Sequence, residues 1–278
     1  MAVVEVTSEP SGLYLRAALG LLPSRRPATL PDSVLQRRGV TVDRDHLARY
    51  NRVCEFRLGD TLPPTYPHIL AFPLAMRLMS GRDFPFPVVG IVHIANRITV
   101  HRAIDAGEAL NLTVRCENLR PHERGQQFDV VAEAASDGVP VWRGVSAYLS
   151  KTATKSDGHG KRDHPLPPAP TARWRVPAGI GGEYAEVSGD RNPIHTSRVG
   201  ARVFGFPRPI AHGMWSKARS LAALEGRLPA EYTVDVAFKQ PILLPSTVGF
   251  HAADTGDGGW EFRVDGTKPH LAGVVTPP

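Results

Sequence analysis

The segment SGDRNPIH, residues 188–195, holds two ionisable side chains suited to proton transfer, Asp190 and His195. Histidine titrates near neutral pH and burial raises the pKa of an aspartate, so the pair can take up and release protons at one place. Pro193 fixes its own φ angle and pushes Asn192 toward an extended conformation. We therefore expect a stiff turn rather than a helix or a strand. The Asn192 amide would then be available to a neighbouring loop or a substrate oxygen.

A second polar segment, RPIAHGMW at residues 208–215, contains Pro209 and Gly213 where a helix is expected to begin. A helix start leaves backbone N–H groups unpaired and carries a positive partial charge. Gly213 has no side chain, so a substrate oxygen can approach those N–H groups closely. The residues therefore predict a site that stabilises a developing oxyanion.

Other interpretations of these residues stay open from the sequence alone. Asp190 in an Asx-turn and His195 on the surface would do no chemistry. Asp190, His195 and His212 could together ligate a metal, but their spacing matches no standard zinc pattern, and we expect no metal. Ser188 lies outside a Gly-x-Ser-x-Gly elbow, which disfavours a nucleophilic serine. The chain has no Walker loop or Rossmann glycine pattern, and we expect no dissociable cofactor.

The elements that must position these residues are a helix and several strands in each half of the chain. Apolar spacing predicts one helix over 66–79 and another over 208–221. Alternating stretches bounded by turn signals predict strands over 88–104, 109–119, 126–135 and 139–150, then over 232–244, 246–253, 259–266 and 270–276. A helix followed by a meandering antiparallel sheet indicates an α+β unit whose sheet wraps the helix. Two such units in tandem could pair their sheets edge to edge.

The two halves read as copies of one unit. Aligning Pro67 with Pro209 also aligns the helices and the strands that follow them, which predicts an internal repeat. From Tyr50 to Pro67 is 17 residues, whereas from the equivalent Tyr184 to Pro209 is 25. The second copy therefore carries eight extra residues, and the acid–imidazole segment lies among them.

A polar, proline-rich stretch, 151–172, predicts a linker between these copies. It separates an N-terminal unit without the polar loop, 1–150, from a C-terminal unit that carries it, 173–278.

Composition limits the class of protein. The 278 residues are 42% hydrophobic, enough for a packed core, and the two cysteines, Cys54 and Cys116, are too few for a disulfide framework. The net charge of +6 is scattered, which disfavours nucleic-acid binding but leaves an anionic small molecule or carrier open. No apolar run reaches the roughly 18 to 20 residues of a membrane span, and no secretory signal is evident. We expect a cytoplasmic protein that does not bind membranes.

The stretch 184–218, YAEVSGDRNPIHTSRVGARVFGFPRPIAHGMWSKA, resembles the signature of the MaoC-like dehydratases, the R-specific enoyl-thioester hydratases. The matching elements are Tyr184-Ala185, Ser188-Gly189-Asp190, Asn192-Pro193-Ile194-His195, Ala201, Gly205-Phe206 and Pro209-Ile210-Ala211-His212-Gly213-Met214. The resemblance implies a hot-dog fold, in which an antiparallel sheet wraps a long central helix. Two fused units resemble the double hot-dog members, with one site per chain and a first half reshaped to admit the acyl tail.

The resemblance also assigns roles. Catalysis falls to Asp190 and His195, and the oxyanion contact to the backbone N–H of Gly213. The substrate-binding residues carried over from the motif are Asn192, His212, Met214 and Tyr184. The implied reaction is the reversible addition of water across the 2,3 double bond of an acyl thioester, in fatty-acid metabolism. We favour Asp190 activating the water and His195 donating the proton, although the sequence does not fix these roles.

The expected partner is an acyl-CoA or acyl-carrier-protein thioester, with Arg208, Lys217 or Lys239 as candidates to contact the carrier phosphates. The chain would be a monomeric double hot-dog or a homodimer. Two alternatives remain: a hot-dog acyl thioesterase, and a non-catalytic acyl-thioester-binding partner subunit of a hydratase.

Overall fold

The computed structural model describes residues 2–7, 26–151 and 169–278. The first half contains β1 (Ala2–Glu5), β2 (Ser33–Val40), α2 (Arg44–Cys54), α3 (Tyr66–Met79), β3 (Val92–Val100), β4 (Leu110–His122), β5 (Gly125–Ser136) and β6 (Val139–Lys151). The second half contains β7 (Ala172–Val176), α4 (Ile180–Ser188), α5 (Pro193–Thr196), α6 (Arg198–Val203), α7 (Gly213–Ala223), β8 (Tyr232–Phe238), β9 (Ser246–Asp254), β10 (Trp260–Asp265) and β11 (Pro269–Thr276).

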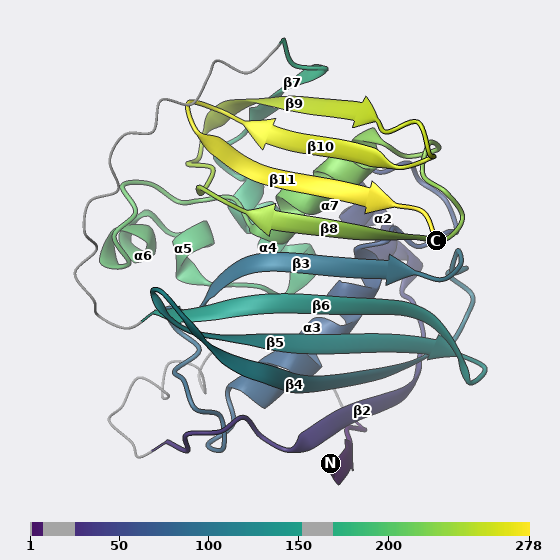
Figure 1. Ribbon diagram of the computed structural model, residues 1–278, viewed down its shortest axis with the longest axis vertical. Helices are drawn as coiled ribbons and strands as arrows, with labels where there is room; N and C mark the ends of the chain where they lie inside the picture. The colour runs from purple at the N-terminus through teal and green to yellow at the C-terminus, as the bar shows by residue number, and fades with distance from the viewer. Residues whose placement is uncertain (1, 8–25, 152–168) are drawn as a thin grey trace.

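In the described part of the chain, the strands form one 11-stranded sheet in the order β1-β2-β4-β5-β6-β3-β8-β11-β10-β9-β7. From its centre outward, each half repeats one order: β3-β6-β5-β4-β2 on one side and β8-β11-β10-β9-β7 on the other. The central strands β3 and β8 pair antiparallel, and α3 and α7 lie on the same face of the sheet (Figure 1). The predicted α+β architecture, with two sheets joined edge to edge, is confirmed.

The internal repeat extends to the helices that precede the central ones. Helices α2 and α4 pack against each other, and the ring centroids of Tyr50 and Tyr184 lie 6.3 Å apart. The alignment of these two tyrosines in the sequence therefore corresponds to equivalent places in the two copies.

The two central helices begin at different places. The first occupies the predicted range, but α7 begins at Gly213 and not at 208. The preceding backbone is instead bonded to other segments: Leu244 N–H to Pro209 O at 2.8 Å, Ile210 N–H to Ile194 O at 3.1 Å, and Ala211 N–H to Ile242 O at 2.9 Å. These bonds hold 209–211 in an extended path, which corrects the predicted helix start.

The predicted linker, 151–172, lies largely outside the described residues, which end at Lys151 and resume at Ala169. Among the helices of the described ranges, none has the length and apolarity that a membrane crossing requires.

Lys217 of α7 joins the two halves from inside. Its side chain is fully buried, and Nζ donates to Asn96 O at 2.9 Å, Asn96 Oδ1 at 2.6 Å and Val234 O at 3.2 Å. Three acceptors match the three N–H bonds of an ammonium group. Asn96 belongs to β3 and Val234 to β8, so one side chain ties α7 to both central strands. The idea that Lys217 contacts carrier phosphates is therefore wrong, because the group has no access to the surface.

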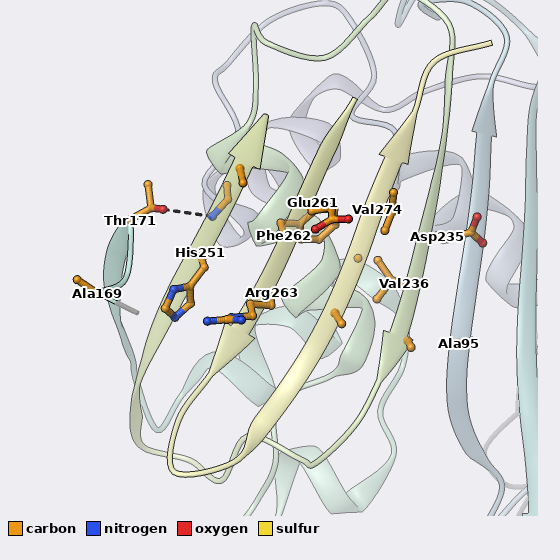
Figure 2. A pocket seen from close by; sticks show the side chains of 15 residues that line it. Ala95, Ala169, Thr171, Asp235, Val236, His251, Glu261, Phe262, Arg263 and Val274 are labelled. Carbon is orange, nitrogen blue, oxygen red and sulfur yellow. Dashed lines mark hydrogen bonds between the residues drawn. The ribbon is translucent and has the colours of Figure 1, made fainter. Parts of the chain in front are cut away.

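The helix-free face of the second half is hollowed. A cavity of about 660 Å³ lies over β8–β11 and β9–β10, and Thr171 accepts a hydrogen bond from the Ala252 N–H at its edge (Figure 2). Small side chains leave this space open: Ala95, Ala237, Ala252, Ala272 and Gly273. None of the predicted site residues lines this cavity.

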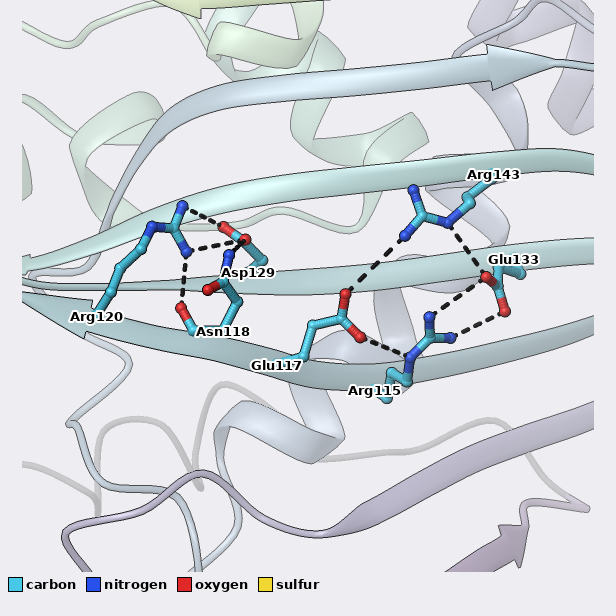
Figure 3. Close-up of polar contacts among 7 residues, drawn as sticks. All are labelled: Arg115, Glu117, Asn118, Arg120, Asp129, Glu133 and Arg143. Carbon is cyan, nitrogen blue, oxygen red and sulfur yellow. Dashed lines mark hydrogen bonds and ion pairs between the residues drawn. The ribbon is translucent and has the colours of Figure 1, made fainter. Parts of the chain in front are cut away.

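The same face of the first half is covered by charged side chains. On β4, β5 and β6, Glu133 pairs with Arg115 at 2.9 Å and with Arg143 at 3.3 Å, and Asp129 pairs with Arg120 at 2.9 Å (Figure 3). Ion pairs near water contribute little stability each, so their main effect is to keep this face solvated. The outer faces of the two copies thus differ in chemistry.

The Lys217 contacts give a stability prediction. Lys217→Ala removes the donor for two backbone carbonyls and the Asn96 amide in the core, so we expect a loss of about 3–5 kcal/mol of unfolding free energy by urea denaturation. The exposed Lys239→Ala should change it by less than about 0.5 kcal/mol. Equal effects of the two substitutions would contradict this account of the join.

Candidate functional site

The loop that carries Asp190 leaves α4 through a glycine. Gly189 caps α4 with φ of 73°, the left-handed region that residues with a side chain rarely adopt. Its N–H donates to Ala185 O at 3.0 Å, and the next N–H, of Asp190, donates to Ser188 Oγ at 3.1 Å. The chain therefore turns sharply out of the helix and directs Asp190 toward the start of α7.

Asn192 and Pro193 begin a short helix, which corrects the expectation of a turn without helix. The Asn192 Oδ1 accepts the Ile194 N–H at 3.3 Å as the N-cap of α5, and Pro193 occupies the first helical position. An asparagine cap followed by proline is a favoured helix start, because proline has no N–H to leave unpaired there. The Asn192 carbonyl oxygen is therefore used by the loop itself, and its amide nitrogen is the group left to meet a substrate.

The Asp190 carboxylate is tied to the loop on one side and faces an imidazole on the other. Oδ1 accepts the Asn192 N–H at 3.2 Å, and Oδ2 lies 3.8 Å from His212 Nε2. The side chain is 32% exposed. The Asp190 carboxylate is thus held in a fixed position and is still partly accessible to solvent.

His195 is oriented by a backbone carbonyl. Its Nδ1 lies 2.8 Å from Ile210 O, so in the neutral ring Nδ1 carries the proton and Nε2 presents a lone pair. Burial lowers the pKa of His195, and the charge of Asp190 and the Ile210 carbonyl oppose that shift in part. The neutral imidazole is therefore the resting form at pH 7.

His212 lies directly beneath His195. Their ring centroids are 3.6 Å apart with planes at 24°, and His212 is 3% exposed. Its Nε2 donates to Asp190 O at 2.9 Å, so one buried ring supports the other imidazole and holds the Asp190 backbone. Burial and the adjacent His195 lower the pKa of His212 to about 3, which keeps this ring neutral.

Gly213 begins α7 beside these imidazoles. His212 is the N-cap and makes no side-chain cap bond, so the Gly213 N–H has no acceptor within the helix. A Cβ at this position would lie 3.1 Å from the Phe238 ring, closer than ordinary van der Waals contact. The start of α7 therefore packs closely against the Phe238 ring, and glycine is the residue that this close approach admits.

The remaining predicted residues surround this centre. Tyr184 is 1% exposed and its ring centroid lies 4.9 Å from that of His212, while Met214 is 6% exposed within α7. The Tyr184 hydroxyl has no hydrogen-bond partner in the described part of the chain. Arg208 donates to Pro245 O at 3.3 Å and lies at the surface, as does Lys239.

Asp190, His195 and His212 form a cluster that could hold a metal, since one ligand atom of each lies within 4.8 Å of the others. However, His212 uses Nε2 as a donor to the Asp190 carbonyl, and His195 uses Nδ1 toward Ile210. A metal bound through His212 Nε2 would have to break the bond that holds the loop. The hydrogen bonds therefore suit proton transfer better than ligation.

Two cavities among the described residues lie elsewhere. One is the outer hollow of about 660 Å³, and the other, of about 200 Å³, lies between residues 56–67 and 221–232. Neither cavity is lined by Asp190, His195, His212 or Gly213.

Two contributors to the site were missed from the sequence. The Ile210 carbonyl orients His195, and the Phe238 ring faces Gly213. A backbone carbonyl has no sequence signal. Phe238 carried a weak signal, since it continues the alternation of Val234 and Val236 in the predicted strand.

Comparison with known proteins identifies the family of the chain. The family described as "MaoC like domain" matches residues 181–274. A "3-hydroxyacyl-thioester dehydratase X" of Mycobacterium tuberculosis is 39% identical over 277 residues, 96% of this chain and 99% of that protein. The chain belongs to the MaoC-like dehydratase family.

Solved structures place this MaoC-like chain in the same fold. A crystal structure of HtdX from Mycobacterium tuberculosis matches 88% of this chain and 100% of its own, with a TM-score of 0.79 and 36% identity. Another M. tuberculosis protein, described as having a double hot-dog fold, covers 85% of this chain and 92% of its own with a TM-score of 0.50 and 12% identity. The MaoC-like chain is a double hot-dog protein, as its sequence predicted.

The hydrogen bonds fix two tautomers that nuclear magnetic resonance can test. At pH 7 the ring ¹⁵N shifts should show His195 protonated on Nδ1 and His212 on Nε2, and the His212 ring should stay neutral to about pH 3. Histidines of the urea-unfolded chain, which titrate near 6.5, provide the control. A His212 ring that becomes charged near neutral pH would overturn the assignment.

Proposed function

We propose that this protein is a (3R)-hydroxyacyl-thioester dehydratase that also runs in reverse as a trans-2-enoyl-thioester hydratase. The observation that carries the proposal is the convergence of Asp190, an oriented His195 and the N–H of Gly213 at one helix start. The name of the M. tuberculosis relative, a 3-hydroxyacyl-thioester dehydratase, supports it. The preference for the R isomer rests on the family resemblance.

The start of α7 is proposed to polarise the thioester. A carbonyl oxygen that accepts a hydrogen bond from the Gly213 N–H would also be stabilised by the positive end of the helix dipole. Removing a proton from C2 builds negative charge on that oxygen, and a fixed N–H donor stabilises the charge without having to reorganise.

Asp190 and His195 are proposed to share one proton. In dehydration, neutral His195 takes the C2 proton on Nε2, while protonated Asp190 gives its proton to the leaving 3-hydroxyl, which departs as water. In hydration, Asp190 accepts a proton from the water that attacks C3, and the His195 imidazolium protonates C2. The reacting form of the pair thus carries one proton more than a carboxylate beside a neutral imidazole, and in either direction that proton stays with the pair and changes only its location.

Several finer assignments remain part of the proposal. The carrier is CoA or an acyl-carrier protein, with Arg208 and Lys239 as surface candidates for its phosphates. A cytoplasmic location, the direction used in the cell, and a monomeric or homodimeric state are expectations from the sequence.

Removing either proton-transfer group should lower turnover. Asp190→Asn and His195→Gln should each reduce the rate at least about a hundredfold, because general acid–base groups typically contribute that much. The measurement follows absorbance of the conjugated enoyl thioester together with free thiol. A hydratase removes conjugation without thiol release, a thioesterase releases thiol, and a binding subunit does neither.

Glu186→Gln, an exposed acid of α4, is the matched control and should keep wild-type turnover. A near-normal rate in a folded Asp190→Asn or His195→Gln variant would remove that residue from the mechanism.

Gly213→Ala tests the oxyanion position separately. The added methyl would crowd the Phe238 ring and the approach to the N–H, so we expect kcat/KM to fall at least about tenfold while the protein stays folded. Gly182→Ala places a methyl in open space on α4 and should leave kcat/KM unchanged. An active Gly213→Ala variant would argue against a thioester oxygen at this helix start.

A further inference from the structure

Four aromatic or imidazole rings form a row that crosses the sheet from the first half into the second. Phe128 of β5 lies 5.7 Å from Tyr148 of β6, Tyr148 lies 4.6 Å from His93 of β3, and His93 lies 5.0 Å from Phe238 of β8, measured between ring centroids. The bulge in the β3–β6 pairing between His93 and Ala95 places His93 opposite Tyr148. The row is therefore a continuous surface between the two halves.

The row begins at the candidate site. Phe238 is the ring that a Cβ on Gly213 would meet at 3.1 Å. From α3, Phe72 lies 3.8 Å from the Cβ position of Gly189, next to Asp190. An acyl chain that ran from the start of α7 along Phe238 would reach His93 next.

A second imidazole faces the row from α3. His68 lies 6.3 Å from His93, with planes at 18°, and 6.5 Å from Phe72. His68, His93, Tyr148 and Phe238 all stay partly exposed although they lie between a helix and the sheet. A chain entering along the row would contact both imidazoles.

These imidazoles have hydrogen-bonding capacity that the described residues do not use. His93 Nε2 is buried and has no hydrogen-bond partner, and His68 makes ring contacts but no hydrogen bond with the residues that the structure describes. Burial lowers the pKa of His68 to about 4 and that of His93 well below its ordinary value, and the nearby charge of Lys217 acts in the same direction. Both rings are thus neutral at pH 7, and a neutral ring offers one donor and one acceptor.

An alkyl chain would leave these nitrogens unpaired, and an unpaired buried polar group is costly. An oxygen on the chain would pair with them. We propose that His68 and His93 form a polar subsite that hydrogen-bonds a hydroxyl or carbonyl oxygen carried by the acyl chain beyond C3. The enzyme then prefers oxygenated acyl thioesters to plain alkyl ones of equal length. This inference rests on the proposed function, because it deepens the substrate class of the same site.

The test uses two (3R)-hydroxyacyl-CoA thioesters of equal chain length, one plain and one with a keto oxygen midway along the chain. A short series that moves the oxygen along the chain locates the subsite. Turnover is measured with the wild type. Binding is measured by calorimetry with Asp190→Asn, so that the preference for the keto substrate can be detected even when turnover is slow. We expect the best-placed oxygen to improve kcat/KM and Kd at least about tenfold, the size of one net hydrogen bond.

The variants separate this subsite from the rest of the enzyme. His68→Leu and His93→Leu should each remove most of the preference by weakening the keto substrate, while the plain substrate is unchanged or improved. His68→Gln and His93→Gln keep a hydrogen-bonding group and should retain part of the preference. His101→Leu, at the other end of the same strand segment and paired with Glu231, is the matched control and should change neither substrate.

Each alternative result has a distinct meaning. The inference is overturned, and the proposed function left intact, if two results are found. The wild type turns over the plain substrate and every keto isomer equally, and Asp190→Asn binds them equally. Equal losses for both substrates in His68→Gln and His93→Gln would also overturn it, because the rings would then contact the carrier or the thioester. Binding that shows the preference without any water elimination would support the subsite and contradict the proposed reaction.

Discussion

The hydrogen bond from the His212 imidazole to the Asp190 carbonyl is the interaction on which the site depends. It joins the loop after α4 to the start of α7, two segments that are 22 positions apart in the chain. The same ring lies flat beneath His195, whose own Nδ1 is held by the Ile210 carbonyl. Because His212 is buried and neutral, its geometry does not change with pH in the physiological range. The family motif assigns His212 to substrate binding, which stays a prediction, and its bonds show that it also positions the loop and the His195 ring.

The two copies of the fold contribute different parts of the structure. In the described ranges, the first supplies six strands to the shared sheet and the second five, and each supplies a central helix, but only the second has the extra loop and the glycine start. Its helix begins five positions later than its counterpart because the preceding backbone bonds to the loop and to the segment after β8. Lys217 then fixes that helix against strands from both copies. The first copy in turn faces the site with aromatic and imidazole side chains.

Local patterns in the sequence predicted much of this structure. Apolar spacing located α3 at its observed ends, alternation located the four strands that follow the central helix in each half, and the tandem arrangement predicted sheets paired edge to edge. The loop motif identified Asp190, His195 and Gly213 as the residues to bring together. The predicted elements were confirmed because each pattern reflects a property of neighbouring residues, and the roles of the three site residues stay a prediction.

What the sequence did not predict depends on contacts between distant segments. The start of α7 is set by backbone bonds to residues 194, 242 and 244. His93 faces the row of rings because of a bulge, which alternation cannot locate. Lys217 did carry a signal, since it sits among the apolar positions Met214, Ala218 and Leu221 on the buried side of its helix. A lysine at such a position indicates a buried bond donor, not a surface contact.

The central claim is that Asp190 and His195 act as one unit that relocates a single proton. The most direct measurement is the hydration rate of the double variant Asp190→Asn/His195→Gln beside the two single variants. Groups that act together give strongly non-additive losses, so the double variant should fall within about tenfold of the slower single variant. If the two losses simply multiply, the residues act independently and the account of a shared proton is wrong.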